Sequence, residues 1–365
     1  MQIAKKISTC FYGSFKQESQ MDYRQLGRTD LNVSAICLGT MTWGEQNSQS
    51  DAFAQIERAK ADGINFIDTA EMYPVPPKKE TYASTETILG NWFKQSGDRA
   101  DWILASKIAG PGNGIDYIRG GQLKFNRDHI VAALDASLKR LQTDYLDLYQ
   151  LHWPERSTNF FGKLGYNHSE EHFTPLLEVL EALDEQVKAG KIRHVGLSNE
   201  TPWGTMKFLA ESDAHGLTRP VSIQNPYNLL NRSFEVGLAE VAIREQCGLL
   251  AYSPMAFGML SGKYADGARP AKGRLSLYSR FTRYFNPQSE AACARYVALA
   301  REHGLDPAQM ALAFVTSRSF VTSNIIGATT LEQLESNLAS AELVLSDEVL
   351  AGIEAIHKDQ PNPAP

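Results

Sequence analysis

From residue 21 onward, the chain alternates between short apolar segments of strand length and longer segments with helical spacing. The eight strand-like segments cover residues 34–38, 64–67, 102–106, 146–151, 192–197, 221–224, 249–252 and 324–326. Helical spacing is found at residues 50–61, 84–95, 128–141, 174–189, 202–214, 234–245, 290–303 and 331–343. Because strands that are apolar throughout are typical of covered parallel sheets, eight such units in series predict a single (β/α)8 TIM barrel.

A doubly wound open sheet is the alternative for this alternation. Such a sheet usually carries a Gly-x-Gly-x-x-Gly fingerprint in the turn after its first strand. The corresponding turn here is Gly39-Thr-Met-Thr-Trp-Gly44, which lacks that spacing. The sequence therefore favours the barrel, and a chain of 365 residues fits one barrel with insertions.

The barrel pattern is extended at both ends. Residues 23–26 and 31–33 flank a Gly-Arg-Thr-Asp turn and predict an N-terminal β-hairpin, and residues 347–357 predict an extra C-terminal helix. We expect residues 21–358 to form the barrel domain and residues 359–365 a tail. Residues 1–20 lack the uninterrupted apolar core of a secretory signal. We interpret them as a flexible extension or the product of an upstream start codon, with a weak targeting peptide as the alternative.

Composition excludes several classes of partner. Lys and Arg number 36 and Asp and Glu 42, and the formal net charge of −6 argues against nucleic-acid binding. No apolar run approaches the roughly 18–20 residues that cross a membrane. Cys10, Cys37, Cys247 and Cys293 are far apart in the sequence, so we interpret them as free thiols in a reducing compartment and expect no metal site. We expect a cytoplasmic protein, and the complete barrel favours a monomer.

Polar residues directly after the predicted strands are the candidates for function, since active sites of TIM barrels lie at the C-terminal ends of the strands. Asp68 follows the second strand, with Tyr73 five residues later, and Lys107 and His152 follow the third and fourth. Lys107, held by Asp68, is expected to lower the pKa of Tyr73, and His152 can orient a carbonyl oxygen. Taken singly, each residue also has a structural interpretation as a helix cap, a buried ion pair or a core histidine. Together they predict a proton relay suited to hydride addition to a carbonyl.

Several segments, in chain order, resemble one known family. They are Gly63-Ile-Asn-Phe-Ile-Asp68-Thr-Ala-Glu-Met-Tyr73, Ser106-Lys107, Leu151-His152-Trp153-Pro154, Gly196-Leu-Ser198-Asn199, Gln224-Asn225-Pro226-Tyr227 and Tyr252-Ser253-Pro254. On these motifs the chain resembles the aldo-keto reductases over residues 21–357. Within the family it is most similar to the Tas-like bacterial members, and the stretch around Ser261-Gly262-Lys263-Tyr264 also resembles the potassium-channel β-subunit branch.

The resemblance implies a TIM barrel that reduces aldehydes and ketones with NADPH. It implies Tyr73 as the general acid, Asp68 and Lys107 as the residues that tune it, and His152 as the residue that orients the carbonyl. It also implies a cofactor-binding set of Thr40, Ser198, Asn199, Gln224, Tyr252, Ser253, Leu260, Gly262, Lys263, Arg274, Gly327, Thr329, Gln333 and Asn337. Ser198, Asn199 and Gln224 would hold the nicotinamide carboxamide, and Tyr252 would stack on the ring.

A cationic stretch supports an anionic partner independently of the resemblance. Between Gly258 and Phe285, six Lys and Arg residues face a single Asp, a local excess of five positive charges in an acidic protein. The stretch is also longer than an ordinary connection, although a solvated loop is the alternative. By resemblance, Lys263 lies near the pyrophosphate and Arg274 near the adenosine phosphate. Some family members carry Lys and Arg where this chain has Ala328 and Gln333, which places more of any NADPH preference on Arg274 and Thr329.

Aromatic residues suggest the substrate end of the site. Trp43 and Trp153 are expected at the pocket rim and favour an apolar or aromatic carbonyl compound, although aromatic residues also build cores. An NADPH-dependent carbonyl reductase is the favoured function. An NADPH-binding regulatory or sensor protein with little turnover is the first alternative. A lyase or aldolase that uses Lys107 as a Schiff-base amine is the second.

Overall fold

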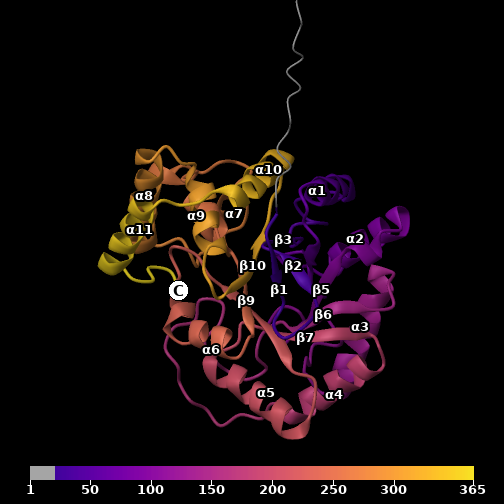
Figure 1. The fold of residues 1–365 in the computed structure, drawn as a ribbon. Coiled ribbons are helices and arrows are strands. Elements are labelled where there is room, and N and C mark those ends of the chain that lie inside the picture. Colours follow the sequence, from indigo (N-terminus) through magenta and orange to yellow (C-terminus); the bar gives the residue numbers. More distant parts are fainter. Residues whose placement is uncertain (1–20) are drawn as a thin grey trace, which may run out of the picture.

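A closed barrel of eight parallel strands forms the centre of the molecule (Figure 1). The computed structural model describes residues 21–365. Around the barrel the strands follow the order β10-β3-β4-β5-β6-β7-β8-β9, so the last strand pairs with the first. Their bounds are β3 Ile36–Gly39, β4 Phe66–Asp68, β5 Ile103–Ile108, β6 Leu146–Leu151, β7 Ile192–Ser198, β8 Pro220–Pro226, β9 Gly248–Tyr252 and β10 Val321–Ile326. The predicted TIM barrel is confirmed.

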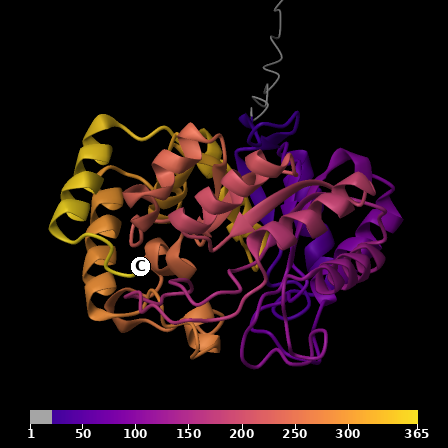
Figure 2. The same ribbon diagram turned by 90° about the horizontal axis from the view of Figure 1, so that it is seen from below.

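A two-stranded antiparallel hairpin precedes the barrel. It consists of β1 (Tyr23–Gln25) and β2 (Asn32–Ser34), with Tyr23 paired to Ser34. Figure 2 shows this hairpin at one end of the barrel and the long loops of both halves of the chain at the other. The predicted hairpin is therefore confirmed, and it lies away from the C-terminal ends of the strands. The predicted extension at residues 1–20 lies outside the described residues.

Helices alternate with the strands and cover the outside of the barrel (Figure 1). Those of the regular units are α1 Gln49–Ala61, α2 Ser84–Ser96, α3 Arg127–Leu141, α4 Leu176–Lys188, α5 Pro202–His215, α6 Leu238–Arg244, α9 Pro307–Thr316 and α10 Leu331–Ala339. Short 3₁₀ turns lie at Arg99–Asp101, Ser233–Val236 and Ser340–Glu342. Asn126 caps α3, because its side chain accepts a hydrogen bond from the His129 amide.

The segment between β9 and β10 contains two α-helices that the sequence did not predict, the four-residue α7 (Arg274–Leu277) and α9 (Pro307–Thr316). Helix α8 (Pro287–Glu302) packs against the C-terminal helix α11 (Asp347–Asp359), and α9 takes the place beside β10 and α10 (Figure 1). Every residue of α9 from Met310 to Thr316 is buried. A helix that is covered on all sides lacks the polar face that produces amphipathic spacing. The sequence pattern therefore revealed α8 and α11 but missed α9.

The described residues also bear on the predictions about cysteines, membrane spans and metal sites. Cys37, Cys247 and Cys293 are free and buried, and Cys10 lies outside the described residues. Within residues 21–365, no helix has both the length and the apolar character to cross a membrane. In the same range, no three His, Cys, Asp or Glu side chains are grouped so that they could hold a metal ion.

Candidate active site

One large cavity opens at the C-terminal ends of the barrel strands. Its volume is about 640 Å³, within the range typical of ligand sites. The predicted residues that line it are Thr40, Asp68, Tyr73, His152, Trp153, Ser198, Asn199, Gln224, Tyr252, Ser253, Lys263, Arg274, Gly327, Thr329 and Gln333. The barrel and the long loop after β9 therefore bring together most of the sequence-predicted site.

Lys107 lies beneath the cavity and connects the Asp68 carboxylate to the Tyr73 phenol. Its ammonium donates to Asp68 Oδ2 at 2.7 Å, to the Thr69 carbonyl at 2.8 Å and to Tyr73 Oη at 3.3 Å. The Lys107 side chain is fully buried, and Tyr73 is 8% exposed at the cavity wall. A charge with no access to water needs this full set of partners. The three residues form one hydrogen-bonded unit, as the spacing of the strand ends predicted.

Two amide side chains donate hydrogen bonds to the second carboxylate oxygen of Asp68, Oδ1. Gln224 Nε2 donates to Oδ1 at 2.8 Å and Gln150 Nε2 donates to the same atom at 3.3 Å. Gln150 belongs to β6 and was not predicted as a site residue. No signal in the sequence marks it, because only its contact with Asp68 identifies it as part of the site. Through these bonds, Asp68 is fixed facing Lys107.

The electrostatic surroundings keep Lys107 charged. Burial acts against its ammonium, but the Asp68 carboxylate and the Tyr73 oxygen outweigh it, so the pKa of Lys107 lies above its usual value.

The expected lowering of the Tyr73 pKa is not found. Burial raises the pKa of the phenol more than the neighbouring Lys107 ammonium lowers it, and the net pKa lies above the usual value. Sequence reasoning identified the partner correctly but could not weigh burial against it. Tyr73 is therefore a phenol that holds its proton at neutral pH.

His152 stands beside Tyr73 as a neutral imidazole. The two rings lie edge to face with their centroids 5.7 Å apart. Burial, with the Lys107 ammonium as a second cause, holds the pKa of His152 well below its usual range. Nδ1 is buried and has no hydrogen-bond partner among the described residues. A neutral histidine in this place can give a hydrogen bond to a carbonyl oxygen in the cavity.

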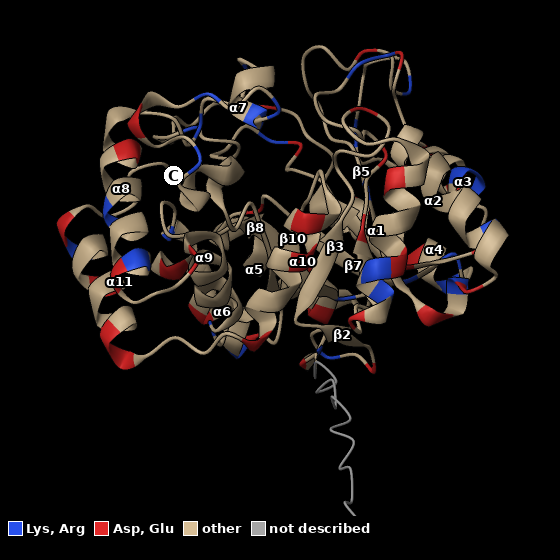
Figure 3. Cartoon of the chain, turned by 90° about the horizontal axis from the view of Figure 1, so that it is seen from above, with Lys and Arg blue, Asp and Glu red and all other residues tan. Residues whose placement is uncertain are grey.

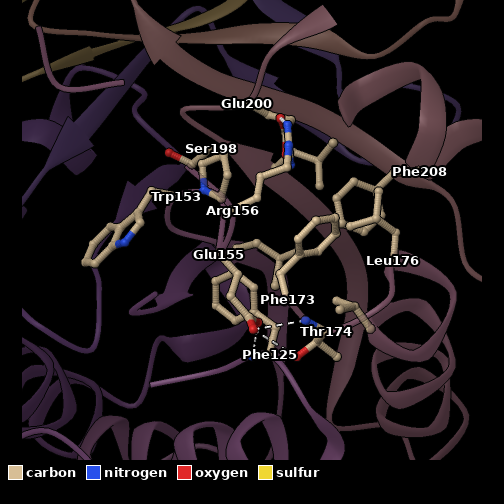
Figure 4. Close-up of a pocket in the computed structure, with 14 residues that line it drawn as sticks. Phe125, Trp153, Glu155, Arg156, Phe173, Thr174, Leu176, Ser198, Glu200 and Phe208 are labelled. Atoms are coloured by element: carbon tan, nitrogen blue, oxygen red, sulfur yellow. Dashed lines mark hydrogen bonds and ion pairs between the residues drawn. The ribbon is translucent and has the colours of Figure 1, made fainter. Parts of the chain in front are cut away.

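The loop that follows His152 is anchored by the half-buried carboxylate of Glu155 and the buried carboxylate of Glu200 (Figure 4). Glu155 accepts hydrogen bonds from the backbone amides of Phe125, at 2.9 Å, and Thr174, at 3.0 Å. Arg156 forms a buried ion pair with Glu200, and both line a second cavity of only about 20 Å³. That space holds no more than a water molecule. This region therefore positions the His152 loop.

Ser198, Asn199 and Tyr252 form a network at the C-terminal ends of β7 and β9. Asn199 Nδ2 donates to the His152 carbonyl at 2.9 Å, and the Tyr252 hydroxyl donates to Asn199 Oδ1 at 2.6 Å. Ser198 Oγ donates to the Gln224 carbonyl at 2.9 Å. Thr40 Oγ1 donates to the Asp68 carbonyl at 2.8 Å, between the ends of the neighbouring strands β3 and β4. These bonds link four predicted cofactor residues to the strand ends that carry the acid and the histidine.

Positive charge gathers at the part of the cavity formed by the long loop. This loop contains the 3₁₀ turns Ala256–Ser261 and Ala265–Gly267 and the short helix α7 (Arg274–Leu277). Figure 3 shows the blue Lys and Arg segments at α7 and in the loops beside it. Lys263, Lys272, Arg274 and Arg280 line the cavity and form no ion pair with any carboxylate of residues 21–365. Burial, followed by the charge of Arg274, lowers the pKa of Lys263, so the cluster favours binding of an anion.

Besides Lys107, four predicted residues do not line the cavity. Trp43 is fully buried in the core, where its indole N–H donates to Gln55 Oε1 at 3.0 Å, so the expectation that it lines the pocket rim is wrong. Leu260 and Gly262 lie behind the loop, Gly262 against the Val297 side chain. Asn337 is buried and donates to the Gly327 carbonyl at 3.3 Å. Gly262 and Asn337 therefore act on the site through the backbone they support.

The closed barrel, the cavity at its strand ends and the buried Tyr–Lys–Asp unit are the arrangement that the resemblance to the aldo-keto reductases led us to expect. Residues 35–358 match the Aldo/keto reductase family, and the chain belongs to this family.

Its relatives agree with the predicted branch. The chain is 56% identical over 347 residues to "Protein tas" of Escherichia coli (strain K12), which covers 94% of this chain and 100% of that protein. It is 32% identical over 351 residues to the L-glyceraldehyde 3-phosphate reductase of Escherichia coli O157:H7, covering 92% of each. It is 30% identical over 354 residues to a putative voltage-gated potassium channel subunit beta of Schizosaccharomyces pombe, covering 93% and 94%.

Proposed function

We propose that this protein is an NADPH-dependent reductase of aldehydes or ketones in which Tyr73 is the general acid. The observation that carries the proposal is the unit of Tyr73, Lys107 and Asp68, which faces the cavity next to a neutral His152. A phenol, an ammonium and an imidazole that converge on one oxygen can bind a carbonyl and protonate it.

Each protonation state fits that role. The raised pKa of Tyr73 keeps its proton available at neutral pH, so the phenol can donate it to the developing alkoxide. The Lys107 ammonium, 3.3 Å from the phenol oxygen, stabilises the phenolate that remains. His152 is neutral and can donate a hydrogen bond without competing for the proton.

The residues present fit a dinucleotide phosphate. When bound, the nicotinamide supplies the hydride. Gln224 uses its Nε2 on Asp68 and Gln150, which leaves Oε1 to accept from the carboxamide. Lys263 and Arg274 have no carboxylate partner among residues 21–365 and would meet the phosphates. Thr329 and Gln333, at the start of α10, line the same cavity and would contact the adenosine end.

The Schiff-base alternative conflicts with the state of Lys107. A nucleophilic lysine must be neutral and accessible. Lys107 is fully buried, has three hydrogen-bond partners and has a raised pKa. The sensor alternative uses the same cavity, and turnover is what separates it from the reductase.

Replacement of Tyr73 by Phe tests the proposal. We expect Tyr73→Phe to lower kcat/KM for a small aldehyde by about 100-fold or more, the range of general acid catalysis, with the Kd for NADPH unchanged in a fluorescence titration. Tyr82→Phe is the matched control, since Tyr82 lies outside the cavity and its hydroxyl contacts Glu71. If Tyr73→Phe retains full turnover, or loses NADPH affinity to the same extent, Tyr73 is not the acid.

A further inference from the structure

Arg283 stands apart from the other cations of the cavity. Arg274 packs on the rings of Phe257 and Phe281, each at 5.5 Å from its guanidinium carbon. Arg283 lines the same cavity on a different wall, where its Nη1 lies 3.4 Å from Tyr252 Oη. Two positive side chains, Lys263 and Arg274, already account for the phosphates of the proposed cofactor. Arg283 therefore needs a separate explanation.

Two independent sets of contacts connect Arg283 to the catalytic histidine. The first is polar: Tyr252, which Arg283 contacts, donates to Asn199, and Asn199 donates to the His152 carbonyl. The second is aromatic: the Arg283 guanidinium lies 5.8 Å from the Phe161 ring, which lies 5.6 Å from Trp153, which lies 4.9 Å from the His152 ring. Both place Arg283 at the end of the cavity where the carbonyl would react.

The loop after β6 holds Arg283 in this position. A Cβ built on Gly162 would lie 3.3 Å from Arg283 Nε, so the loop backbone passes directly beside the guanidinium. Phe161 and Gly162 line the cavity together with Arg283. The cation is thus enclosed by Tyr252 on one side and by the aromatic loop on the other.

The guanidinium has unused donors. Within residues 21–365, Arg283 forms no ion pair, and its hydrogen bond to Tyr252 Oη is long. A guanidinium carries five N–H donors in a plane that matches a carboxylate or a phosphate. A half-buried cation without an acidic partner, at the substrate end of a cavity, fits an anionic group of the ligand.

We propose that Arg283 binds a carboxylate or phosphate of the substrate, so that the preferred substrates are aldehydes or ketones with an anionic group. The inference rests on the proposed reductase function and names its substrate class. The rings of Trp153 and Phe161 connect His152 to Arg283, so the carbon chain between the carbonyl and the anion would pack against these rings.

Matched substrate pairs test this inference. Succinic semialdehyde is compared with butanal, and glyceraldehyde 3-phosphate with glyceraldehyde, as substrates for the wild type, Arg283→Met and Arg283→Lys. We expect the wild type to favour the anionic member of at least one pair. Arg283→Met should reduce the ratio of kcat/KM, anionic over neutral, by about 10- to 100-fold, the value of a hydrogen bond to a charged group. Arg283→Lys should recover part of that ratio. The substrate pair whose ratio falls in Arg283→Met shows whether Arg283 binds a carboxylate or a phosphate.

Arg318→Met is the matched control. Arg318 also packs on an aromatic ring, 4.5 Å from the centroid of Phe314, but it does not line the cavity. Its ratio should equal that of the wild type. An anionic preference that survives in Arg283→Met would overturn the inference, as would a fall in NADPH affinity in that variant, which would make Arg283 a cofactor ligand.

A binding measurement separates this inference from the proposed function. The NADP⁺-saturated protein is titrated calorimetrically with 4-hydroxybutyrate and with butanol. Tighter binding of 4-hydroxybutyrate that is lost in Arg283→Met supports the anion site even if no aldehyde is reduced. Equal binding of the two by the wild type overturns it. If no aldehyde supports NADPH oxidation, the proposed reductase function is contradicted. The binding measurement then decides by itself whether Arg283 forms an anion site.

Discussion

Replacement of Asp68 by Asn should expose the energetic cost of the buried ammonium. Oδ1 of Asp68 accepts from Gln224 and Gln150, so an isosteric Asn keeps its carbonyl there and turns its NH₂ toward Lys107. Two donors then face each other at a site where the carboxylate now lies 2.7 Å from Nζ. Because Lys107 is fully buried, losing its charged partner should destabilise the fold by about 3–5 kcal/mol.

The matched control is the same substitution at an exposed ion pair. Asp135 contacts Lys191 at 2.6 Å, but its side chain is 51% exposed, and Asp135→Asn should cost about 0–1 kcal/mol. Urea unfolding of both variants and the wild type, under identical conditions, gives the comparison. If Asp68→Asn lowers the free energy of unfolding no more than Asp135→Asn does, the argument that burial makes the Asp68–Lys107 pair essential is refuted.

The pH dependence of the same variant supplies a second check. Without the Asp68 carboxylate, burial should lower the pKa of Lys107 below its usual value, which an unfolded chain retains at about 10.4. Between those two pKa values the unfolded state binds more protons, so the stability of Asp68→Asn should rise with pH relative to the wild type. If the stability difference between Asp68→Asn and the wild type stays constant between about pH 7 and about pH 9, Lys107 keeps its proton without the carboxylate.

Other predictions follow from the same geometry. His152 should remain neutral in an NMR titration at the pH where an ordinary histidine, with a pKa of about 6.5, takes up its proton; a midpoint at or above that value would contradict the burial argument. Arg274→Ala should weaken NADPH binding much more than NADH binding in fluorescence titrations, and equal losses would exclude a contact with the 2′-phosphate. Glu155→Gln should lower the stability measured by thermal unfolding, because Glu155 accepts from two backbone amides, by about 1–3 kcal/mol.

The barrel could be predicted because its strands are short, apolar and separated by recognisable helices. The same strand pattern placed Asp68, Lys107 and His152 at the strand ends, where position alone brings them together. Tyr73 lies five residues beyond its strand, and Lys107 Nζ contacts its hydroxyl as expected. Periodicity and position were enough for this part of the site.

Features that depend on burial were not accessible from sequence. Trp43 follows β3 as a rim residue would, yet its ring turns into the core and bonds to Gln55. Helix α9 has no polar face because the helices around it cover it. The direction of the Tyr73 pKa depends on the balance between desolvation and Lys107, which only the packed structure defines. Gln150 was missed because only its contact with Asp68 identifies it.

The most direct test of the reductase assignment is a titration of the purified protein with NADPH and NADH, followed by addition of small aldehydes while nucleotide absorbance is recorded. The structure predicts tighter binding of NADPH, because Lys263 and Arg274 line the cavity without acidic partners in residues 21–365, and oxidation of NADPH that depends on Tyr73. Binding without oxidation across an aldehyde panel that includes anionic members would favour a sensor. Absence of binding by either nucleotide would contradict the account at its centre.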